Sequence, residues 1–572
     1  MPLDAKAHET IRKYAIKNAL EYGKARDDAV LSKVISKMPD LKKDMALLRK
    51  SIHDVVSDVN SLAGEKLRQE AEKYSKEFEE EYKEKVSRTS GPSLAIEGAK
   101  VGSFKTRFSP EPSGYMHIGH AKAAFLELEL SVAYKGKIAL YFDDTNPEKE
   151  KQEYVEAFKK DLEWLGIKFS EEYYASDHID EMYGYARKLI SAGGAYVCDC
   201  KPEQLKASRE SGIACKHKGQ TKEKNLKAWE EMLGKATDSD TVLLLNGDLK
   251  SQNTTMRDPT LFRAKEARHY RQGDRYTVWP TYSFNTPIMD SVMGITDAIR
   301  SKEYEMRDEL YYRILDLLEL RKPRMHSISR LEISGNITSK RKLNELISEG
   351  LIEGYDDPRL VTIAGMRHRG ITPQAIREFV IRFGLSKAES VSDMDTLLSF
   401  NRKIIERNSK RLFCIEDPIL MKVSNIPSSA LKLETTPHPT DGKGNRKYGT
   451  NGKFLISRSD ADKLKEGERI KLKGAFDVRV TKNRNGVDAD YESDSKAEKK
   501  IVWVQEDGSV DCKIMYVGNL LNGDEFNRDS LRISDAKIEG YSSSLKRGDI
   551  VQLEAKGFFK FDGGKDSLLI SL

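Results

Sequence analysis

Cysteine is scarce in this sequence, and long apolar runs are absent. The 572 residues include five cysteines, an odd and small number that argues against the disulfide framework of small secreted domains. No run of about 18 apolar residues occurs, so we expect no membrane span. The first residues, MPLDAKAHETIRKY, contain neither an apolar stretch nor a small-residue cleavage site. We therefore expect no secretory signal and a cytoplasmic protein.

Neither sign of charge dominates the sequence. The formal net charge is +6, although charged residues make up 33% and hydrophobic residues 38% of the chain. This composition is typical of a folded protein with a heavily charged surface. It permits a nucleic-acid partner without requiring one. At roughly 100–200 residues per domain, the length predicts three to five domains.

Apolar residues recur at helical spacing near the N-terminus, which predicts helices over residues 1–65. They include Ile11, Tyr14, Ala15, Ile16, Ala19 and Leu20. Residues 66–86 are dense in charge and in good helix formers, which indicates a solvated connecting helix. The sequence SRTSGPS at 87–93 is typical of a linker.

Residues 103–144 predict the start of a parallel nucleotide-binding sheet. The strand-like run SFKTRFS is followed by a loop that contains Pro110, Pro112 and Gly114. The amphipathic stretch HIGHAKAAFLELELSVAY and the strand-like KIALYFDD come next. Strand, loop, helix and strand within about 40 residues form the βαβ unit of an α/β fold.

The pattern changes twice further along the chain. Residues 190–280 interrupt the α/β pattern and are expected to form an insertion, whereas 321–408 are predicted to be mostly helical. From residue 412 onward, apolar and polar residues alternate, as in RIKLKGAFDVRV and DIVQLEAKGFFKFDGG. This alternation predicts antiparallel β-barrels.

The segment RFSPEPSGYMHIGH, from Arg107 to His120, joins the first predicted strand to the helix. Gly114 and Gly119 allow the backbone to approach a ligand closely, and the free N–H groups at the start of the helix favour a phosphate. The imidazoles of His117 and His120 can donate hydrogen bonds to phosphate oxygens. The alternative is a helix cap with incidental histidines, which the position between two strands, after a Pro/Gly loop, disfavours.

A second basic segment, ITSKRK, begins at Ile337 and contains Lys340. A lysine on a mobile loop can contact the phosphates of a nucleotide more strongly in the transition state than in the ground state, which lowers the barrier. Taken alone, the segment would be interpreted as a solvated basic loop. Its combination with the first motif favours a nucleotide site.

Four side chains of metal-ligand type lie in two close pairs: Cys198, Cys200, Cys215 and His217. Two such pairs can converge tetrahedrally on Zn²⁺. The alternative is a set of reduced free cysteines beside a surface histidine, since the Cys-x-Cys spacing is tighter than the usual zinc-ligand spacing.

These segments resemble the class I aminoacyl-tRNA synthetases, which carry a HIGH signature. RFSPEPSGYMHIGHAKAAF resembles the HIGH region of the glutamyl/glutaminyl branch, and LYFDDTNPEKE resembles its next strand end. Residues 337–342 resemble the second signature, with Ile337 and Thr338 in place of its Lys and Met. The C-terminal β pattern and the N-terminal AIKNALEYGKA are similar to glutamyl-tRNA synthetases of the archaeal or eukaryotic type, because bacterial relatives carry a helical anticodon-binding region.

The resemblance implies a multidomain fold with a Rossmann-type class I catalytic domain. The expected domains are a helical N-terminal extension with linker (1–93), the first catalytic half with the HIGH motif (94–195), an acceptor-binding insertion (196–279), the second catalytic half (280–325), a helical stem-contact region with the SKR loop (326–411), and a β-barrel anticodon-binding region (412–572).

The resemblance also implies roles for individual residues. ATP is expected at Glu111, Pro112, Ser113, His117, Gly119, His120, Ala121, Arg330, Leu331, Ser339 and Lys340, of which His117, His120 and Lys340 are the expected catalytic residues. Glutamate is expected at Arg107, Asp143, Tyr282 and Arg300. Asp143 would pair with the α-ammonium group, and the two arginines would clamp the side-chain carboxylate. Cys198, Cys200, Cys215 and His217 would hold a structural zinc ion.

The implied reaction is the ATP-dependent activation of L-glutamate, with release of diphosphate, and its transfer to the 3′-terminal adenosine of tRNA-Glu, with release of AMP. Mg²⁺ would accompany ATP, and activation would wait for tRNA. One alternative is a glutaminyl-tRNA synthetase, which Arg300 disfavours because those relatives have Cys at this position. Others are an enzyme that also charges tRNA-Gln with glutamate and a HIGH-type nucleotidyltransferase. A non-catalytic tRNA-binding scaffold would be expected to have lost His117, His120 or Lys340. We expect a monomer whose N-terminal helices are available to a protein partner.

Overall fold

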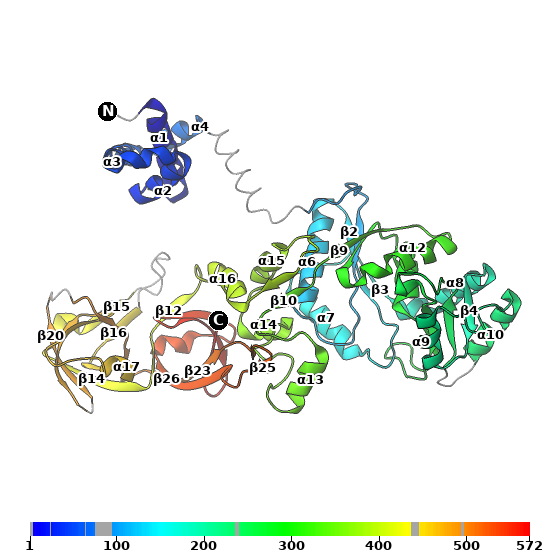
Figure 1. Ribbon diagram of the computed structural model, residues 1–572. Helices are drawn as coiled ribbons and strands as arrows, with labels where there is room; N and C mark the ends of the chain where they lie inside the picture. The colour runs from blue at the N-terminus through cyan, green and yellow to red at the C-terminus, as the bar shows by residue number, and fades with distance from the viewer. Residues whose placement is uncertain are drawn as a thin grey trace. The chain divides into compact units, whose positions relative to one another are not determined.

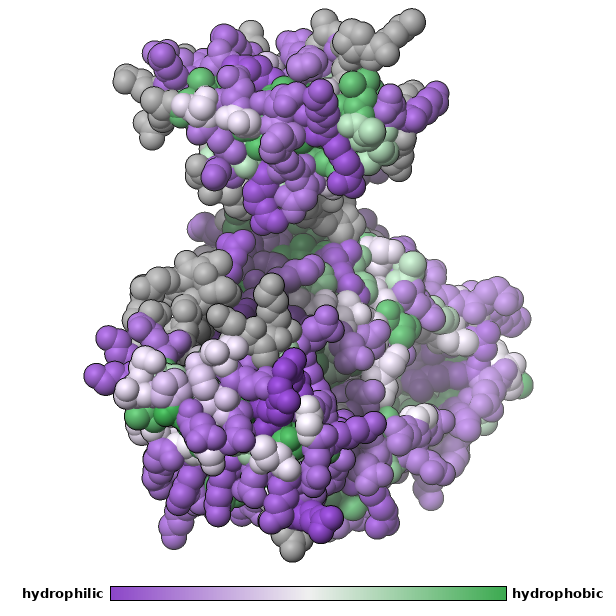
Figure 2. All heavy atoms as spheres, turned by 90° about the vertical axis from the view of Figure 1, so that its left-hand side faces the viewer, coloured by the Kyte–Doolittle hydropathy of each residue, from purple (hydrophilic) through white to green (hydrophobic). Residues whose placement is uncertain are grey.

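A computed structural model describes residues 4–22, 24–62, 64–74, 94–234, 240–435, 446–484, 486–493 and 497–572. The chain divides into two compact units, Met1–Gly91 and Pro92–Leu572, which are described separately (Figure 1). Within the described ranges, no helix is both long and apolar enough to cross a membrane. The face drawn in Figure 2 is mostly hydrophilic, with apolar residues scattered over it, as the high content of charged residues predicts.

The N-terminal unit is helical, as the periodicity of residues 1–65 predicts. Its elements are α1 (Ala5–Tyr22), α2 (Asp27–Lys37), η1 (Pro39–Asp44), α3 (Met45–Ser61) and α4 (Gly64–Glu72). Side chains at helical spacing form its core, among them Ile11, Ala15, Val34, Ile52 and Val56. Most of the predicted connecting helix and all of the predicted linker lie outside the described residues.

The predicted βαβ unit is confirmed. Strands β1 (Lys105–Phe108), β2 (Lys137–Phe142) and β3 (Glu171–Tyr174) are parallel, in that order. Helix α6 (Ile118–Ala133) joins β1 to β2, and α7 (Gln152–Trp164) joins β2 to β3.

A second parallel pair continues this arrangement. It consists of β8 (Asp297–Ser301) and β9 (Arg324–Ile328). The pair lies beside β1, because Thr296 donates its N–H to the carbonyl of Lys105 at 2.8 Å. Strand β9 ends at Ile328, three residues after the boundary expected at 325. The carboxyl ends of β1 and β8 therefore meet at one edge, where ligands bind in open α/β sheets.

The insertion has an antiparallel sheet of its own. Its strands are β4 (Ala195–Cys198), β5 (Val242–Leu245), β6 (Thr260–Ala264) and β7 (Val278–Pro280), in that order. Around it lie η2 (Ala175–His178), α8 (Ile179–Ser191), α9 (Pro202–Ser211), α10 (Lys222–Gly234) and η3 (Thr254–Met256). The chain returns to the parallel strands through α11 (Tyr282–Val292), and η4 (Lys302–Arg307) and α12 (Asp308–Leu317) follow β8.

The region after β9 is mostly helical, as predicted. Its helices are α13 (Lys340–Ser348), α14 (Ile363–Arg369), α15 (Pro373–Ile381) and α16 (Met394–Ile405). Two short parallel strands, β10 (Leu331–Ile333) and β11 (Ser390–Ser392), accompany them. Helix α14 begins beside the HIGH segment, where Ile118 donates its N–H to the carbonyl of Val361 and Ile363 donates to that of Met116.

The C-terminal region forms two barrel-like sheets of seven strands each, which confirms the predicted β architecture. One sheet contains β12 (Lys410–Leu412), β27 (Ile550–Leu553), β28 (Gly557–Gly563), β29 (Leu568–Ser571), β23 (Val510–Val517), β26 (Leu531–Ile538) and β13 (Cys414–Glu416), in that order. The other contains β21 (Lys500–Ile501), β18 (Arg469–Leu472), β19 (Asp477–Asn483), β20 (Val487–Glu492), β14 (Pro418–Ser424), β17 (Lys453–Ser457) and β22 (Val504–Gln505).

Smaller elements lie between successive strands within each C-terminal sheet. They are the hairpin β15 (Lys432–Thr435) and β16 (Arg446–Gly449), the hairpin β24 (Leu521–Asn522) and β25 (Glu525–Phe526), and the short helices η5 (Ser428–Ala430), α17 (Arg458–Ala461) and η6 (Gly540–Ser544).

The β24–β25 hairpin packs directly against the segment that carries the second signature. Leu520 is buried in one apolar cluster with Leu343 of α13. Leu521 donates its N–H to the carbonyl of Gly335 at 3.0 Å. On α14, Arg369 donates to the carbonyls of Ser571 and Val517. Removing residues 412–572 would expose these contacts, so single substitutions test the C-terminal region better than a truncation does.

Candidate functional site

A cavity of about 510 Å³ lies where β1, α6, β8 and α13 meet. Most residues expected to bind ATP or glutamate line it: Glu111, Ser113, His117, Gly119, His120, Asp143, Tyr282, Arg300, Arg330, Leu331 and Lys340. The two signatures, far apart in the sequence, therefore face one space.

Three residues of the expected ATP site do not line this cavity. Ala121 is completely buried in the core, because it is on the inner face of α6. Pro112 is buried, and its carbonyl accepts the N–H of Lys151. Ser339 is the N-cap of α13 without a side-chain capping hydrogen bond. The side chains of these three residues therefore do not line the cavity, and their contact with ATP stays a prediction.

The histidine pair at the start of α6 has a defined tautomer. Nδ1 of His117 accepts the N–H of Gly119 at 3.1 Å, and Nδ1 of His120 accepts the N–H of His117 at 3.2 Å. Burial lowers the pKa of His117 to about 4, with help from the charge of Arg330, and lowers the pKa of His120 well below its usual value. Both rings are therefore neutral and carry their proton on Nε2, which can donate to a ligand oxygen.

Gly119 is required by this arrangement. A Cβ atom at position 119 would lie 2.9 Å from Cε1 of the His117 ring and 3.0 Å from Nδ1. Any side chain there would displace the imidazole, and the N–H of residue 119 could no longer hold its Nδ1.

Lys340 crosses the mouth of the cavity from the first residue of α13. Its ammonium group donates to the carbonyl of Ser113 and lies 4.6 Å from the centre of the Tyr154 ring. Its side chain passes over Gly114, where an added Cβ would be 3.5 Å from Cδ of Lys340. The lysine of the second signature therefore contacts the loop of the first signature, within reach of a phosphate held between them.

Asp143 and Tyr282 also line this cavity. Asn285 donates to the Asp143 carboxylate at 2.7 Å. Burial, together with the negative charges of Glu111 and Asp144, raises the pKa of Asp143 to about 7. A substrate ammonium group would stabilise the ionised carboxylate and lower this pKa again. Tyr282 packs against Tyr304, with 4.8 Å between ring centres.

Arg300 lies at the end of β8 and is 8% exposed. It forms an ion pair with Asp308 at the start of α12, and its guanidinium carbon lies 5.6 Å from the centre of the Tyr311 ring. Among the described residues, Nε of Arg300 has no hydrogen-bond partner. A buried guanidinium with a free donor on a cavity wall is suited to a ligand carboxylate.

Arg107 is buried and paired inside the protein. Its guanidinium is 1% exposed and does not line the cavity. Nε and Nη2 donate to the two carboxylate oxygens of Asp290 at 2.6 and 3.2 Å, and Nη1 donates to the carbonyl of Ile299 at 3.0 Å. Of the two arginines of the expected clamp, Arg300 lines the cavity and Arg107 pairs with Asp290. The clamp itself stays a prediction.

A second cavity, of about 580 Å³, adjoins the first and was not predicted from the sequence. The two share Glu111, Asp143, Tyr282 and Tyr304. Four arginines line the second cavity, namely Arg209, Arg257, Arg263 and Arg307. They come from the insertion and from η4, so no local motif contains them. The cavity also contains Glu111, Asp143 and Glu150, and its arginines are suited to the phosphates of a nucleic-acid end.

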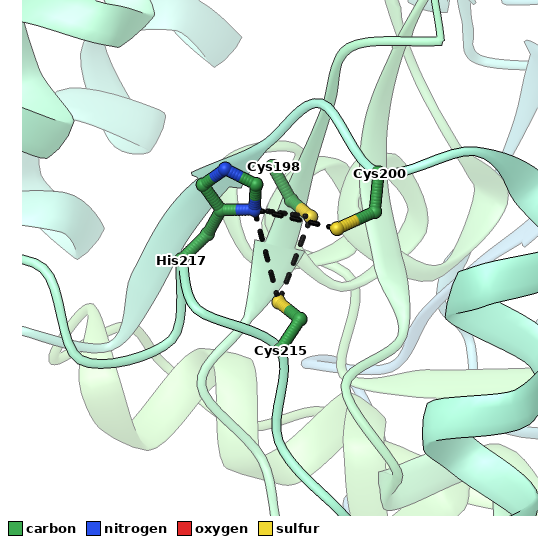
Figure 3. A group of neighbouring side chains, drawn as sticks. All are labelled: Cys198, Cys200, Cys215 and His217. Carbon is green, nitrogen blue, oxygen red and sulfur yellow. Dashed lines mark hydrogen bonds between the residues drawn. The ribbon is translucent and has the colours of Figure 1, made fainter.

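The four predicted metal ligands converge at the end of β4 (Figure 3). Their ligand atoms all lie within 4.8 Å of one another. Nδ1 of His217 lies 3.3 Å from Sγ of Cys198, and the sulfurs of Cys198 and Cys215 are 3.7 Å apart. The other ring nitrogen of His217 lies 2.9 Å from the carboxylate of Asp199. Such a contact orients a metal-binding imidazole.

A third cavity, of about 330 Å³, lies between the two C-terminal barrels. Its walls include Phe413, Tyr448, Trp503 and Tyr541. Tyr541 is 41% exposed, whereas Trp503 is 1% exposed. Aromatic faces in an open cavity are suited to stacking with a nucleobase.

Comparison with known proteins defines the class to which this fold and site belong. Residues 103–407 match the family described as tRNA synthetases class I (E and Q), catalytic domain. Residues 409–493 and 500–562 match its two anti-codon binding domains. The chain belongs to the class I tRNA synthetases of the E and Q group.

Individual relatives indicate which members of this group the chain resembles. The chain is 39% identical to the glutamate–tRNA ligase of Nitrosopumilus maritimus (strain SCM1) over 99% of each chain. It is 39% identical to that of Cenarchaeum symbiosum (strain A) over 96% of each chain. The bifunctional glutamate/proline–tRNA ligase of Mus musculus is 36% identical over 82% of this chain and 33% of the mouse protein. The resemblance to the archaeal and eukaryotic type is confirmed.

Proposed function

We propose that this chain is a glutamate–tRNA ligase, which activates L-glutamate with ATP and transfers it to the 3′-terminal adenosine of tRNA-Glu. The observation that carries the proposal is the cavity that unites both signatures with Arg300. The two histidines and Lys340 surround one end of the space. On its wall, Asp143 supplies a carboxyl group, Tyr282 an aromatic ring and Arg300 a cation. An amino acid with an acidic side chain requires an anion for its ammonium group and a cation for its side-chain carboxylate.

In the first step, a carboxylate oxygen of glutamate attacks the α-phosphorus of ATP, and diphosphate leaves. The Nε2–H groups of His117 and His120 would donate to phosphate oxygens, and the N-terminus of α6 adds its positive dipole. Lys340 would balance the charge that develops on the phosphates. Mg²⁺ would arrive on ATP, whose phosphates supply oxygen ligands, and Glu111 offers an exposed carboxylate in the wall.

In the second step, the terminal ribose hydroxyl of tRNA attacks the acyl carbon of the adenylate. We propose that the second cavity receives the 3′ end of tRNA, because its arginines adjoin the proposed glutamate site. We also propose that the ligase is monomeric and that its N-terminal unit, which has its own apolar core, contacts a protein partner.

Charging assays test the proposed function. Purified chain should attach glutamate to tRNA-Glu and should not attach glutamine to either tRNA-Glu or tRNA-Gln. The same assay with glutamate and tRNA-Gln decides whether the enzyme discriminates between the two tRNAs. Exchange of labelled diphosphate into ATP, with and without tRNA, detects the activation step. If the chain binds tRNA but neither exchanges diphosphate into ATP nor attaches glutamate to tRNA, it is a scaffold and the proposal is wrong.

We propose that the anticodon loop reaches the cavity between the barrels, where a base stacks on Tyr541. Stacking of a base on an aromatic side chain contributes about 1–3 kcal/mol. Tyr541→Ala should therefore raise the KM for tRNA by about tenfold and leave the KM for ATP unchanged. Ile533→Ala is the matched control, because Ile533 is 51% exposed on the same barrel but does not line the cavity. Equal tRNA KM values for the two variants would contradict this placement.

We propose that Cys198, Cys200, Cys215 and His217 bind a structural zinc ion. The donor set fits, because two sulfurs about 2.3 Å from a tetrahedral zinc lie about 3.8 Å apart, close to the 3.7 Å between Cys198 and Cys215. Zinc would tie the chain after β4 to the loop before α10 and so stiffen the insertion.

Metal analysis tests this proposal. Protein prepared without chelator should contain about one zinc per chain, since four ligands complete a closed structural site. Cys215→Ser should lose the metal and lower the melting temperature. Cys512→Ser should keep it, because Cys512 is buried in the C-terminal barrel beside Cys414. Zinc-free wild-type protein, or equal zinc content in both variants, would contradict the assignment of these four residues as zinc ligands.

A further inference from the structure

One acidic side chain on the wall of the first cavity has no place in the chemistry above. Glu127 lies on α6, two turns after His120, and lines the cavity together with Ala123 between them. It is 1% exposed. Among the described residues, its Oε2 has no hydrogen-bond partner. A buried carboxyl oxygen without a partner is destabilising, so a role in core packing alone does not explain it.

The neighbours of Glu127 place it at the amino-acid end of the cavity. The charged groups that face it are Arg107 from β1 and Asp290 from α11. Arg107 also donates to the carbonyl of Ile299, the residue before Arg300 on β8. Ile299 and Arg300 line the same cavity as Glu127.

These neighbours also decide the charge of Glu127. The bidentate bond between Arg107 and Asp290 already pairs the nearby cation with an anion. An ionised Glu127 would be a second anion beside one cation, with 1% of its surface exposed to solvent. Burial accordingly raises the pKa of Glu127 well above its usual value, the positive charge of Arg107 opposes the shift and Asp290 reinforces it. Burial therefore favours the uncharged carboxyl, which has an O–H to donate.

We propose that Glu127 contacts the amino-acid substrate and helps to select it, by donating a hydrogen bond from its uncharged carboxyl group to a carboxylate oxygen of glutamate. The bond is charge-assisted, because its acceptor is an anion. Ionisation of Glu127 would replace the bond by repulsion between two carboxylates. The inference rests on the glutamate site proposed above, and it adds a second contact that favours an anionic substrate beside Arg300.

The raised pKa of Glu127 determines in which direction the KM for glutamate changes with pH. The neutral form binds glutamate, and the raised pKa keeps this form present to a higher pH than for an ordinary glutamate side chain. As the pH rises toward the pKa of Glu127, the ionised form accumulates and the KM for glutamate increases. The substrate ammonium group also titrates at alkaline pH. It does so for every variant, so the ratio of KM values between variants isolates Glu127.

Diphosphate exchange in the presence of tRNA, measured against pH, tests the proposal. Glu127→Gln keeps a donor of the same shape but cannot ionise. Its KM for glutamate at neutral pH should stay within about threefold of the wild-type value, and the wild-type rise at alkaline pH should be absent. Glu127→Ala should raise the KM for glutamate by about tenfold, the effect of losing one hydrogen bond to a charged group. The KM for ATP should not change in either variant.

The matched control is Glu129→Gln, on the same helix. Glu129 pairs with Arg377 and does not line the cavity, so this variant should keep the wild-type pH profile. The inference is overturned if Glu127→Gln also keeps that profile, or if Glu127→Ala leaves the KM for glutamate unchanged. It is also overturned if Glu127→Ala raises the KM values for ATP and glutamate equally while lowering the melting temperature, since this is the result of lost packing alone.

Failure of this inference can be distinguished from failure of the glutamate site. Substitution of Arg300 tests the site without involving Glu127. If the Arg300 variant loses glutamate selectively while the Glu127 variants behave as wild type, only the role of Glu127 is wrong.

Discussion

Replacing Lys340 by alanine is expected to lower the rate of glutamate activation by about 10²–10³-fold, the scale of losing one strong transition-state contact. In the structure the Lys340 ammonium is held at the HIGH loop by the carbonyl of Ser113. That bond is made before any phosphate arrives, so the lysine is already in position. ATP affinity should change much less than the rate, because the contact strengthens as charge develops on the leaving diphosphate.

The measurement is diphosphate exchange with tRNA present, together with the KM for ATP. Lys342→Ala is the matched control, because Lys342 follows two residues later in the first turn of α13 and is exposed. It should exchange at nearly the wild-type rate. If Lys340→Ala also did so, the second signature would have no part in the chemistry.

The second large effect concerns the choice of amino acid. Glutamate and glutamine are nearly isosteric, so only charge and hydrogen-bond polarity separate them. The free Nε donor of Arg300 suits a carboxylate, whereas the N–H₂ group of glutamine would face a cation with its own donors. Arg300→Cys should lower kcat/KM for glutamate by about 10²-fold or more, the scale of breaking a buried charge-assisted contact. The value for glutamine should fall little or rise.

The structure suggests a second variant and a control for this experiment. Asp308, the ion-pair partner of Arg300, would lose its cation in the variant and repel the substrate carboxylate. Arg300→Cys combined with Asp308→Asn should therefore recover part of the loss for glutamate. Arg313→Cys, at an exposed position on the same helix as Asp308, is the control and should behave as wild type. Equal loss for both amino acids in Arg300→Cys would make Arg300 a structural or ATP-side residue.

Local patterns in the sequence were sufficient for the architecture. The alternation after residue 412 predicted the barrels, because period-two hydrophobicity is a property of single strands. The segment around His117 and His120 predicted a phosphate site, since a strand, a loop and a helix N-terminus are contiguous in the chain. The cysteine and histidine pairs were recognisable for the same reason, and the structure brings all four ligand atoms together.

Only the tertiary structure decided which charged groups meet. Arg107 lies in the most recognisable motif, yet Asp290 occupies its guanidinium. Asp308, the arginines of the second cavity and the hairpin against α13 lie on separate elements. The state of Glu127 likewise depends on β1 and α11, neither of which adjoins it in sequence. Residue type and spacing therefore determined the elements and the class of chemistry. Which side chains face the substrate depends on burial and on ion pairs between distant segments, which form only when the elements pack.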